Sequence, residues 1–349
     1  MSLADQPDSH QPDYEQPDSD RPNRPDSDRP NPPVDRPNPP ADAPAWRVAS
    51  KTGHRILAGT ASWTDPTMTA EGVFYPRDAD TPEERLRYYS SLYPLVEVDA
   101  TYYALPSERV AAAWARRTPP GFTFDVKAHA LMTTHPTELK RLPKTIQNML
   151  AEEDRAKARV YLRDLPAEAK EALFGFFRDA LQPLVDAGKL GAVLLQFPPW
   201  FFPSNESREH IVEVRERLGM PVTVEFRHGS WFNEKNRDRT LDFLSNHALP
   251  YVVVDEPQGF KSSVPAVLQV TSPDLAIVRF HGRNAETWER KGLTPAERFR
   301  YLYKEKELEE WVPKVRQVAE KARETHLLFN NCYANYGTTN ARQLAEMLL

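Results

Sequence analysis

Short apolar runs that become polar at their C-terminal end recur along this chain. The clearest covers residues 222–231, where a β-branched and aromatic half is followed by Glu225, Arg227 and His228. Such a run is typical of a buried parallel strand, which delivers the charged residues at its end into a site. The sequence therefore predicts eight strands. Besides the one at Val222, they begin at Ile56, Leu95, Phe122, Ala192, Tyr251, Ala276 and His326.

Helical patterns separate most of these runs. Thr81, followed by a proline and two glutamates, predicts a helix start, and residues 167–187 predict a long helix before Gly188. One long charged helix is expected from about Tyr303 to Arg323. The connection over residues 128–189, between the third and fourth strands, is long enough to be an insertion.

Strands that alternate with helices favour a parallel sheet with crossover connections. Eight such units over residues 45–349 fit a single (β/α)₈ TIM barrel, which typically needs about 250 residues plus insertions. An open doubly wound sheet is the alternative. It is less favoured because the chain contains no Gly-rich dinucleotide loop and no Walker motif.

Residues 1–44 differ from the rest in composition. They hold twelve of the 33 prolines and four Arg against nine Asp and one Glu, so their net charge is −6, whereas the whole chain carries −5 and the rest of it therefore +1. Such a segment cannot bury enough apolar surface to offset chain entropy, and we predict a disordered tail. The tail is interpreted as a solubility segment, with a docking arm for a partner as the alternative.

Composition also bears on location. No stretch approaches the roughly 18 uncharged apolar residues that a membrane span needs, and the N-terminus lacks the apolar core of a secretory signal. The one cysteine, Cys332, rules out an intramolecular disulfide. We therefore predict a cytoplasmic protein without membrane contact.

Several short motifs follow one another in a specific order along the chain. They lie at 59–63, 74–76, 96–103, 122–127, 134–135, 195–199, 224–228, 279–283 and 329–331, with Trp114, Thr118, Pro119 and Trp231. Their order resembles that of a known family, the domain of unknown function 72 or YecE-like family. The resemblance spans nearly all of residues 55–349 and implies a TIM barrel, but no activity. Asp99 and Ala100 depart from it, since the family usually shows Asn and Ser there.

In a TIM barrel the site lies at the C-terminal ends of the strands. We predict Glu225 or Asp255 as general base and His281 as acid, base or electrostatic stabiliser. Lys127, Arg227 and Arg279 are predicted to clamp an anionic group such as a phosphate. The remaining candidates are substrate-binding: Trp63, Asp99, Tyr102, Gln196, Asn330 and Asn331, with His129 nearby.

These residues favour an enzyme, a hydrolase or phosphoryl-processing activity on an anionic small molecule or nucleic-acid fragment. A structural ion network is the alternative for each single charge. A divalent metal on Glu225, Asp255 and His281 is possible from ligand type, but no ligand motif supports it.

A non-catalytic nucleic-acid- or protein-binding module is the second function that we consider. Its nucleic-acid form would draw on side chains that offer charge or stacking surfaces. They are Lys127, Lys140, Arg141, Lys144, Arg227, Arg283, Arg290, Trp63, Tyr102, Tyr103, Trp200, Trp231 and Trp288. Packing anchors are the alternative for these aromatic residues.

Overall fold

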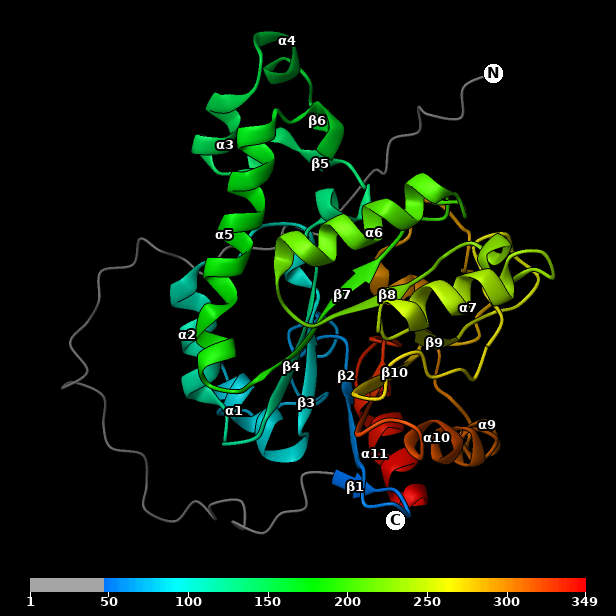
Figure 1. Ribbon diagram of the computed structural model, residues 1–349. Coiled ribbons are helices and arrows are strands. Elements are labelled where there is room, and N and C mark those ends of the chain that lie inside the picture. Colours follow the sequence, from blue (N-terminus) through cyan, green and yellow to red (C-terminus); the bar gives the residue numbers. More distant parts are fainter. Residues whose placement is uncertain (1–46) are drawn as a thin grey trace, which may run out of the picture.

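Eight parallel strands form the centre of the molecule (Figure 1). The computed structural model describes residues 47–349, and the tail predicted at 1–44 lies outside the described residues. The strands are Arg55–Thr60 (β2), Leu95–Val98 (β3), Thr123–Lys127 (β4), Leu190–Gln196 (β7), Val222–Glu225 (β8), Val252–Asp255 (β9), Leu275–Phe280 (β10) and Glu324–Phe329 (β11). Around the sheet they run β8–β7–β4–β3–β2–β11–β10–β9.

The ring closes between β8 and β9. Val224 forms a parallel bridge with Tyr251, and its N–H donates to the carbonyl oxygen of Pro250 at 2.9 Å. A short strand, Arg47–Ala49 (β1), adds to β2 in the antiparallel direction. The predicted (β/α)₈ barrel is therefore confirmed.

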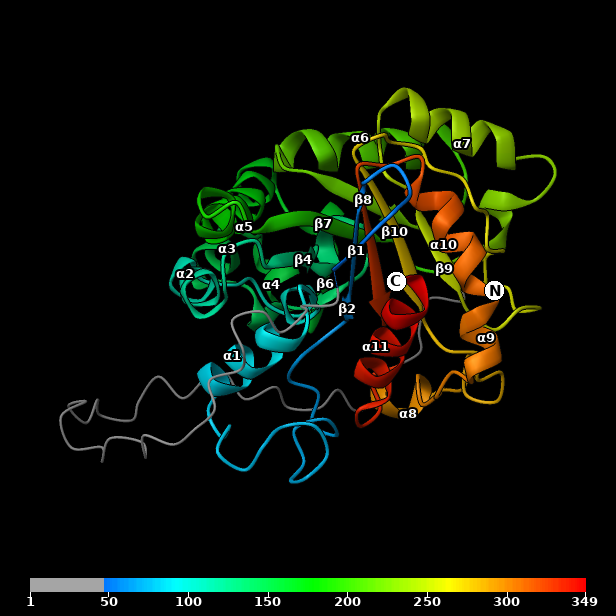
Figure 2. The same ribbon diagram turned by 90° about the horizontal axis from the view of Figure 1, so that it is seen from below.

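Helices surround the strands, as both views show (Figures 1 and 2). The first begins as its sequence predicts, because Thr81 and Glu84 cap each other's backbone N–H groups. None of the helices within residues 47–349 has the length and apolar character needed to cross a bilayer. The main helices are Pro82–Leu92 (α1), Glu108–Arg117 (α2), Ala167–Asp186 (α5), Asn205–Leu218 (α6), Arg237–Asn246 (α7), Glu305–Glu309 (α9), Trp311–Ala319 (α10) and Tyr336–Leu348 (α11).

The helix expected from Tyr303 to Arg323 is interrupted. It consists of α9 and α10, which meet at Glu310. Pro313 has no N–H to donate to the carbonyl oxygen of Glu309, so the helical ladder is broken at that point. The shorter Pro295–Arg298 (α8) precedes both.

The insertion after β4 contains small elements of its own. A two-stranded antiparallel sheet forms where Thr137–Glu138 (β5) pairs with Arg159–Val160 (β6). Lys144–Met149 (α3) and Glu152–Arg155 (α4) lie between these strands in sequence, and α3 contacts α5. Figure 1 shows the group at one end of α5. Short 3₁₀ helices at Ala100–Tyr102, Ala130–Thr133, Leu139–Arg141, Leu162–Asp164 and Gly229–Phe232 complete the element list.

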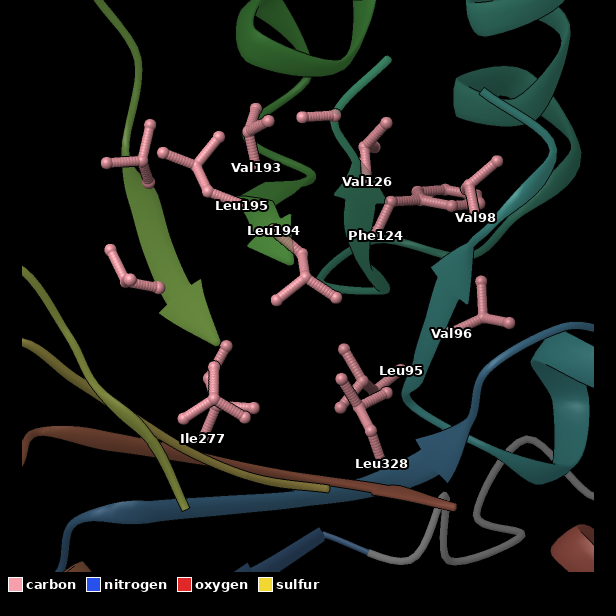
Figure 3. Close-up of a cluster of buried hydrophobic side chains, with 14 of the residues drawn as sticks. Leu95, Val96, Val98, Phe124, Val126, Val193, Leu194, Leu195, Ile277 and Leu328 are labelled. Carbon is pink, nitrogen blue, oxygen red and sulfur yellow. The ribbon is translucent and has the colours of Figure 1, made fainter. Parts of the chain in front are cut away.

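An aliphatic layer fills the middle of the barrel. Leu95, Leu194, Ile277 and Leu328 are all buried, and Figure 3 shows them between the strands. Gly59 lies opposite both Leu95 and Leu328 in the sheet, where a Cβ would collide with the Leu95 carbonyl oxygen. This close approach requires glycine and draws β2 and β3 together.

Below this layer, at the N-terminal ends of the strands, lies a buried histidine with two acids. Nδ1 of His326 is 2.7 Å from an Asp125 oxygen, and Nε2 is 2.8 Å from Glu324. Burial alone would lower the pKa of His326, but the two carboxylates raise it to about 9. The other Asp125 oxygen accepts from the N–H of Ala192. We call Asp125, Glu324 and His326 the lower cluster.

Candidate functional site

Arg279 organises the opposite, C-terminal end of the barrel. Its side chain is buried, and its guanidinium donates to Glu225 at 2.5 Å, to Glu97 at 2.7 Å and to Gln196 at 3.2 Å. The bonds reach from β10 to three other strands. Burial opposes the charged form, but Glu225 and Glu97 raise the pKa of Arg279. The guanidinium expected to clamp a ligand therefore holds the barrel's own carboxylates.

His281 is held on both ring nitrogens. The Asn330 side-chain amide lies 3.0 Å from Nδ1, and Nε2 lies 3.2 Å from Glu225. Burial lowers the pKa of His281 to about 3, so the ring is neutral. With the amide donating to Nδ1, the ring proton is on Nε2 and points at Glu225.

Glu225 is the most heavily bonded carboxylate of the group. It accepts from Arg279 and His281, and Arg227 approaches it at 3.2 Å. Burial would raise the pKa of Glu225, but these cationic and hydrogen-bonding neighbours hold it well below its usual value. A carboxylate so occupied is a weak proton acceptor.

Glu97 and Asp99 lie on the inner side of β3 and its end. One Glu97 oxygen accepts from Arg279, and the other is buried without a hydrogen-bond partner among the described residues. Burial raises the pKa of Glu97 to about 7 and that of Asp99 to about 6. Both groups therefore titrate near neutrality, where a general acid or base works best.

Lys127 ends β4 beside these two acids. Its ammonium lies 4.8 Å from the centre of the Tyr102 ring. Lys127 makes no close ion pair among residues 47–349, but the charges of Glu97, Asp99 and Glu225 act on it from a longer distance. Burial, and next the charge of Arg279, lower the pKa of Lys127, and these three carboxylates partly offset the shift. We call Glu97, Lys127, Glu225, Arg279 and His281 the mouth cluster.

Arg227 and Glu256 border the mouth cluster on the β8–β9 side. The guanidinium lies 3.2 Å from Glu225 and from Glu256, and 4.7 Å from the centre of the Trp288 ring. Burial raises the pKa of Glu256 to about 7. The backbone N–H of Val264 donates to its other oxygen.

Comparison with known proteins places the chain in a family. A family model described as "Protein of unknown function DUF72" matches residues 57–349. The protein belongs to the DUF72 family. The resemblance found in the sequence is therefore confirmed, and the family description states no activity.

Relatives of this DUF72 protein match over most of their own length. UPF0759 protein YunF of Bacillus subtilis (strain 168) is 32% identical over 297 residues, covering 84% of this chain and 94% of that protein. A solved DUF72 family structure from Thermotoga maritima is 32% identical, with a TM-score of 0.65 over 84% of this chain and 98% of its own. Another, from Enterococcus faecalis, is 26% identical, with a TM-score of 0.66 over 84% and 95%.

The DUF72 barrel places Asp255 away from Glu225 and His281. Asp255 pairs in register with Phe280, and its carboxylate bonds to Arg283 at 2.9 Å. Side chains alternate along a strand, so the next residue, Glu256, occupies the inner position. Sequence reasoning also missed Glu97. The signal was available, because a glutamate between Val96 and Val98 in a buried strand has to face the barrel interior.

Three other candidates of the DUF72 chain lie outside the mouth cluster. Trp63 is buried against Trp114 and Phe124, with ring centres 5.9 and 6.4 Å away. Asn331 donates to the Tyr301 carbonyl oxygen and to the Asn340 side chain, which fixes the loop after β11. His129 accepts from the N–H of Leu131 and is buried.

The tryptophans considered for base stacking differ in how much of their surface is exposed. Trp231 and Trp288 are buried, as is Trp63, whereas Trp200 is 54% exposed. Lys127 and Tyr102 touch at the mouth. Lys140 and Arg141 lie on the insertion, where both pair with Glu138.

Metal chemistry has no preformed site in the described part of the DUF72 chain. Within residues 47–349 no three His, Cys, Asp or Glu side chains group as metal ligands do. Of the three that ligand type suggested, Glu225 faces Arg279 and Asp255 faces Arg283. Arginines occupy the lone pairs that a cation would need.

Proposed function

We propose that this protein is an enzyme that binds an anionic small molecule at the barrel mouth and hydrolyses it, a phosphoester being the substrate that suits the site best. Lys127 carries the proposal. Its ammonium makes no close ion pair among the described residues, whereas Arg279, Arg227 and Arg283 all pair with carboxylates. The carboxylates of Glu97, Asp99 and Glu225 act on the Lys127 charge from a longer distance. A partly buried ammonium without a close acceptor costs stability, and a bound phosphate would accept its hydrogen bonds.

Glu97 is the proposed general base. Its free oxygen and its pKa of about 7 suit removal of a proton from an attacking water at neutral pH. The proton that Glu97 takes from the water then passes to the leaving-group oxygen, and Asp99, whose pKa of about 6 leaves it mostly ionised at neutral pH, is proposed to orient the water. This differs from the role that the sequence suggested for Glu225, whose oxygens are occupied by Arg279, His281 and Arg227.

Glu225, His281 and Asn330 then act as positioning residues. Their bonds fix Arg279, and Arg279 in turn holds one oxygen of Glu97, while the other has no hydrogen-bond partner among the described residues. Preorganised groups of this kind lower the cost of reaching the transition state. We also propose a cytoplasmic location, which the single cysteine supports.

Binding is tested first, with inorganic phosphate as the probe and calorimetry as the measurement. Lys127→Ala is expected to weaken phosphate binding more than tenfold. Lys157→Ala is the matched control, because that lysine is exposed on the insertion and pairs with Asp154 and Asp164. Equal affinity in wild type and Lys127→Ala would remove Lys127 from the site, and absence of binding to the wild type would refute the anion site.

Turnover is tested with p-nitrophenyl phosphate and bis(p-nitrophenyl) phosphate. Glu97→Gln is expected to lower kcat about 10²–10⁴-fold with KM little changed. Wild-type kcat/KM should rise with pH through about 7, the pKa of Glu97, and the variant should lose this limb. If Glu97→Gln keeps full kcat and Glu225→Gln loses it, the general base is Glu225. Phosphate binding without turnover of either ester would favour the non-catalytic alternative.

A further inference from the structure

An arc of aromatic and imidazole rings follows the C-terminal ends of successive strands. Tyr102 comes after β3, His135 after β4, Trp200 and Phe202 after β7, and His228 after β8. These four loops all belong to the end of the barrel that holds the mouth cluster. We call these five rings the aromatic rim.

The aromatic rim begins at Lys127, whose ammonium contacts the Tyr102 ring. The Lys127 ammonium lies 4.8 Å from the Tyr102 ring, Tyr102 lies 5.2 Å from His135, and His135 lies 5.5 Å from Trp200. Phe202 meets His228 at 4.7 Å. A ligand anchored on Lys127 therefore has rings within reach along one side.

Two rim side chains expose much of their surface. Trp200 is 54% exposed and Phe202 is 53% exposed. Each meets its histidine at a steep angle, 72° for Trp200 and 80° for Phe202, so a histidine does not stack flat on either ring. Large aromatic residues normally bury their surface, and an open ring beside a polar site offers a stacking surface.

The loop that carries both rings is firmly anchored. Between them, Phe201 is buried and stacks on Phe197 at 4.1 Å, and its carbonyl oxygen accepts from the Trp231 indole at 2.7 Å. The Phe202 carbonyl oxygen accepts from the hydroxyl of Ser207. Rings held in this way lose little conformational entropy when a ligand stacks on them.

We propose that the aromatic rim is a base-stacking subsite, so that the substrate of the mouth is a nucleotide with its phosphate on Lys127 and its base on Trp200. The inference rests on the proposed function and narrows its substrate class. A nucleotide joins an anion to a flat heteroaromatic ring, which is the pair of features that the mouth and rim present together. Stacking of a base on an aromatic side chain contributes about 1–3 kcal/mol.

Calorimetry with four probes tests the inference: a nucleoside 5′-monophosphate with each of the common bases, ribose 5-phosphate, adenosine and a 5′-phosphorylated single-stranded hexanucleotide. Trp200→Ala should weaken the monophosphates at least tenfold and ribose 5-phosphate less than twofold. Phe176→Ala is the matched control, since that aromatic ring is 40% exposed on α5. It should change neither affinity.

The outcomes separate this inference from the proposed function. Ribose 5-phosphate that binds as tightly as every monophosphate, or an equal loss of both in Trp200→Ala, would overturn the base subsite and leave the anion site standing. Adenosine binding that depends on Trp200, with phosphate affinities unchanged in Lys127→Ala, would support the subsite and refute the anion site. Tighter binding of the hexanucleotide assigns the ligand to a strand end, and equal binding assigns it to a free nucleotide; both support the inference.

Discussion

Each end of the barrel interior contains a buried histidine beside carboxylates, but the pKa of the histidine is shifted in opposite directions at the two ends. His326 in the lower cluster has a carboxylate on each ring nitrogen, which raises its pKa to about 9. His281 in the mouth cluster shares one carboxylate with Arg279, and burial lowers its pKa to about 3. At the lower end the charged groups are in close pairs, whereas at the mouth Lys127 makes no close ion pair among the described residues.

Two lysines repeat this contrast. Lys189, which precedes β7 at the lower end, donates to the carbonyl oxygens of Ala115 and Thr118 at 2.6 and 2.7 Å and to the Thr118 hydroxyl at 2.9 Å. Burial lowers the pKa of Lys189 and of Lys127 alike. Of the two lysines, only Lys189 has hydrogen-bond acceptors among the described residues, and its bonds tie the start of β7 to the end of α2. This difference supports the proposed role of Lys127 in binding an anion.

The largest effect is expected at the lower cluster. Asp125→Ala leaves His326 with one carboxylate and removes the acceptor of the Ala192 N–H. Breaking a buried ion pair costs about 3–5 kcal/mol of unfolding free energy, measured by denaturant titration. Asp274→Ala is the control, because its pair with Arg323 is exposed and should cost less than about 1 kcal/mol. Equal losses in both variants would contradict a structural role for the lower cluster.

The second effect is a pH dependence of stability. The folded-state pKa of His326, about 9, lies above the unfolded value, so its stabilisation is complete below about pH 6.5. It is lost as pH rises through 9, by on the order of 2–3 kcal/mol. His326→Gln should therefore differ most from wild type at pH 6 and least at pH 10. A difference that does not change with pH would show that His326 is not charged in the folded protein.

Methionine in place of each lysine compares the two ends directly. Lys189→Met leaves carbonyl oxygens of α2 without a donor, and about 1–3 kcal/mol of unfolding free energy should be lost. Lys127→Met removes a charge whose burial outweighs the attraction of the nearby carboxylates, and it should gain about 1 kcal/mol. Thermal unfolding of both variants measures the difference. If both lose stability equally, Lys127 is part of the structural framework.

The smallest effect concerns Glu97. Its folded-state pKa of about 7 lies above the unfolded value, so it favours folding at low pH and costs stability as pH rises from about 4.5 through 7. Glu97→Gln should raise the melting temperature at pH 8 by a few degrees and change it little at pH 4. A lower melting temperature of the variant at pH 8 would mean that the ion pair of Glu97 with Arg279 stabilises the fold by more than the burial of the ionised carboxylate destabilises it.

Much of the fold could be predicted from the sequence, because each buried strand corresponds to a short run of apolar residues. The strand beginning at Ile56 and the cap at Thr81 needed only local information. The break at Glu310 also had a local cause in Pro313, which the long charged pattern around it concealed.

The site was harder to predict from the sequence, because the side chains that contact one another in it lie far apart along the chain. Gln196, Glu225 and Arg279 were expected at the mouth, and they lie there together. Which charged side chains form close ion pairs depends on contacts between residues about 180 positions apart in sequence, such as Glu97 and Arg279. No local sequence pattern indicates that Arg279 makes close ion pairs and that Lys127 does not.

The aliphatic layer of Leu95, Leu194, Ile277 and Leu328 keeps the hydrogen-bond networks of the two clusters separate. A proton gained at Glu97 removes no hydrogen-bond partner from His326, whose counter-ions are Asp125 and Glu324. Stability changes from substitutions on opposite sides should therefore add, as they do for sites without shared partners. Substitutions among the groups at the mouth of such a barrel can then leave the lower cluster intact, and one architecture can therefore support unrelated chemistries.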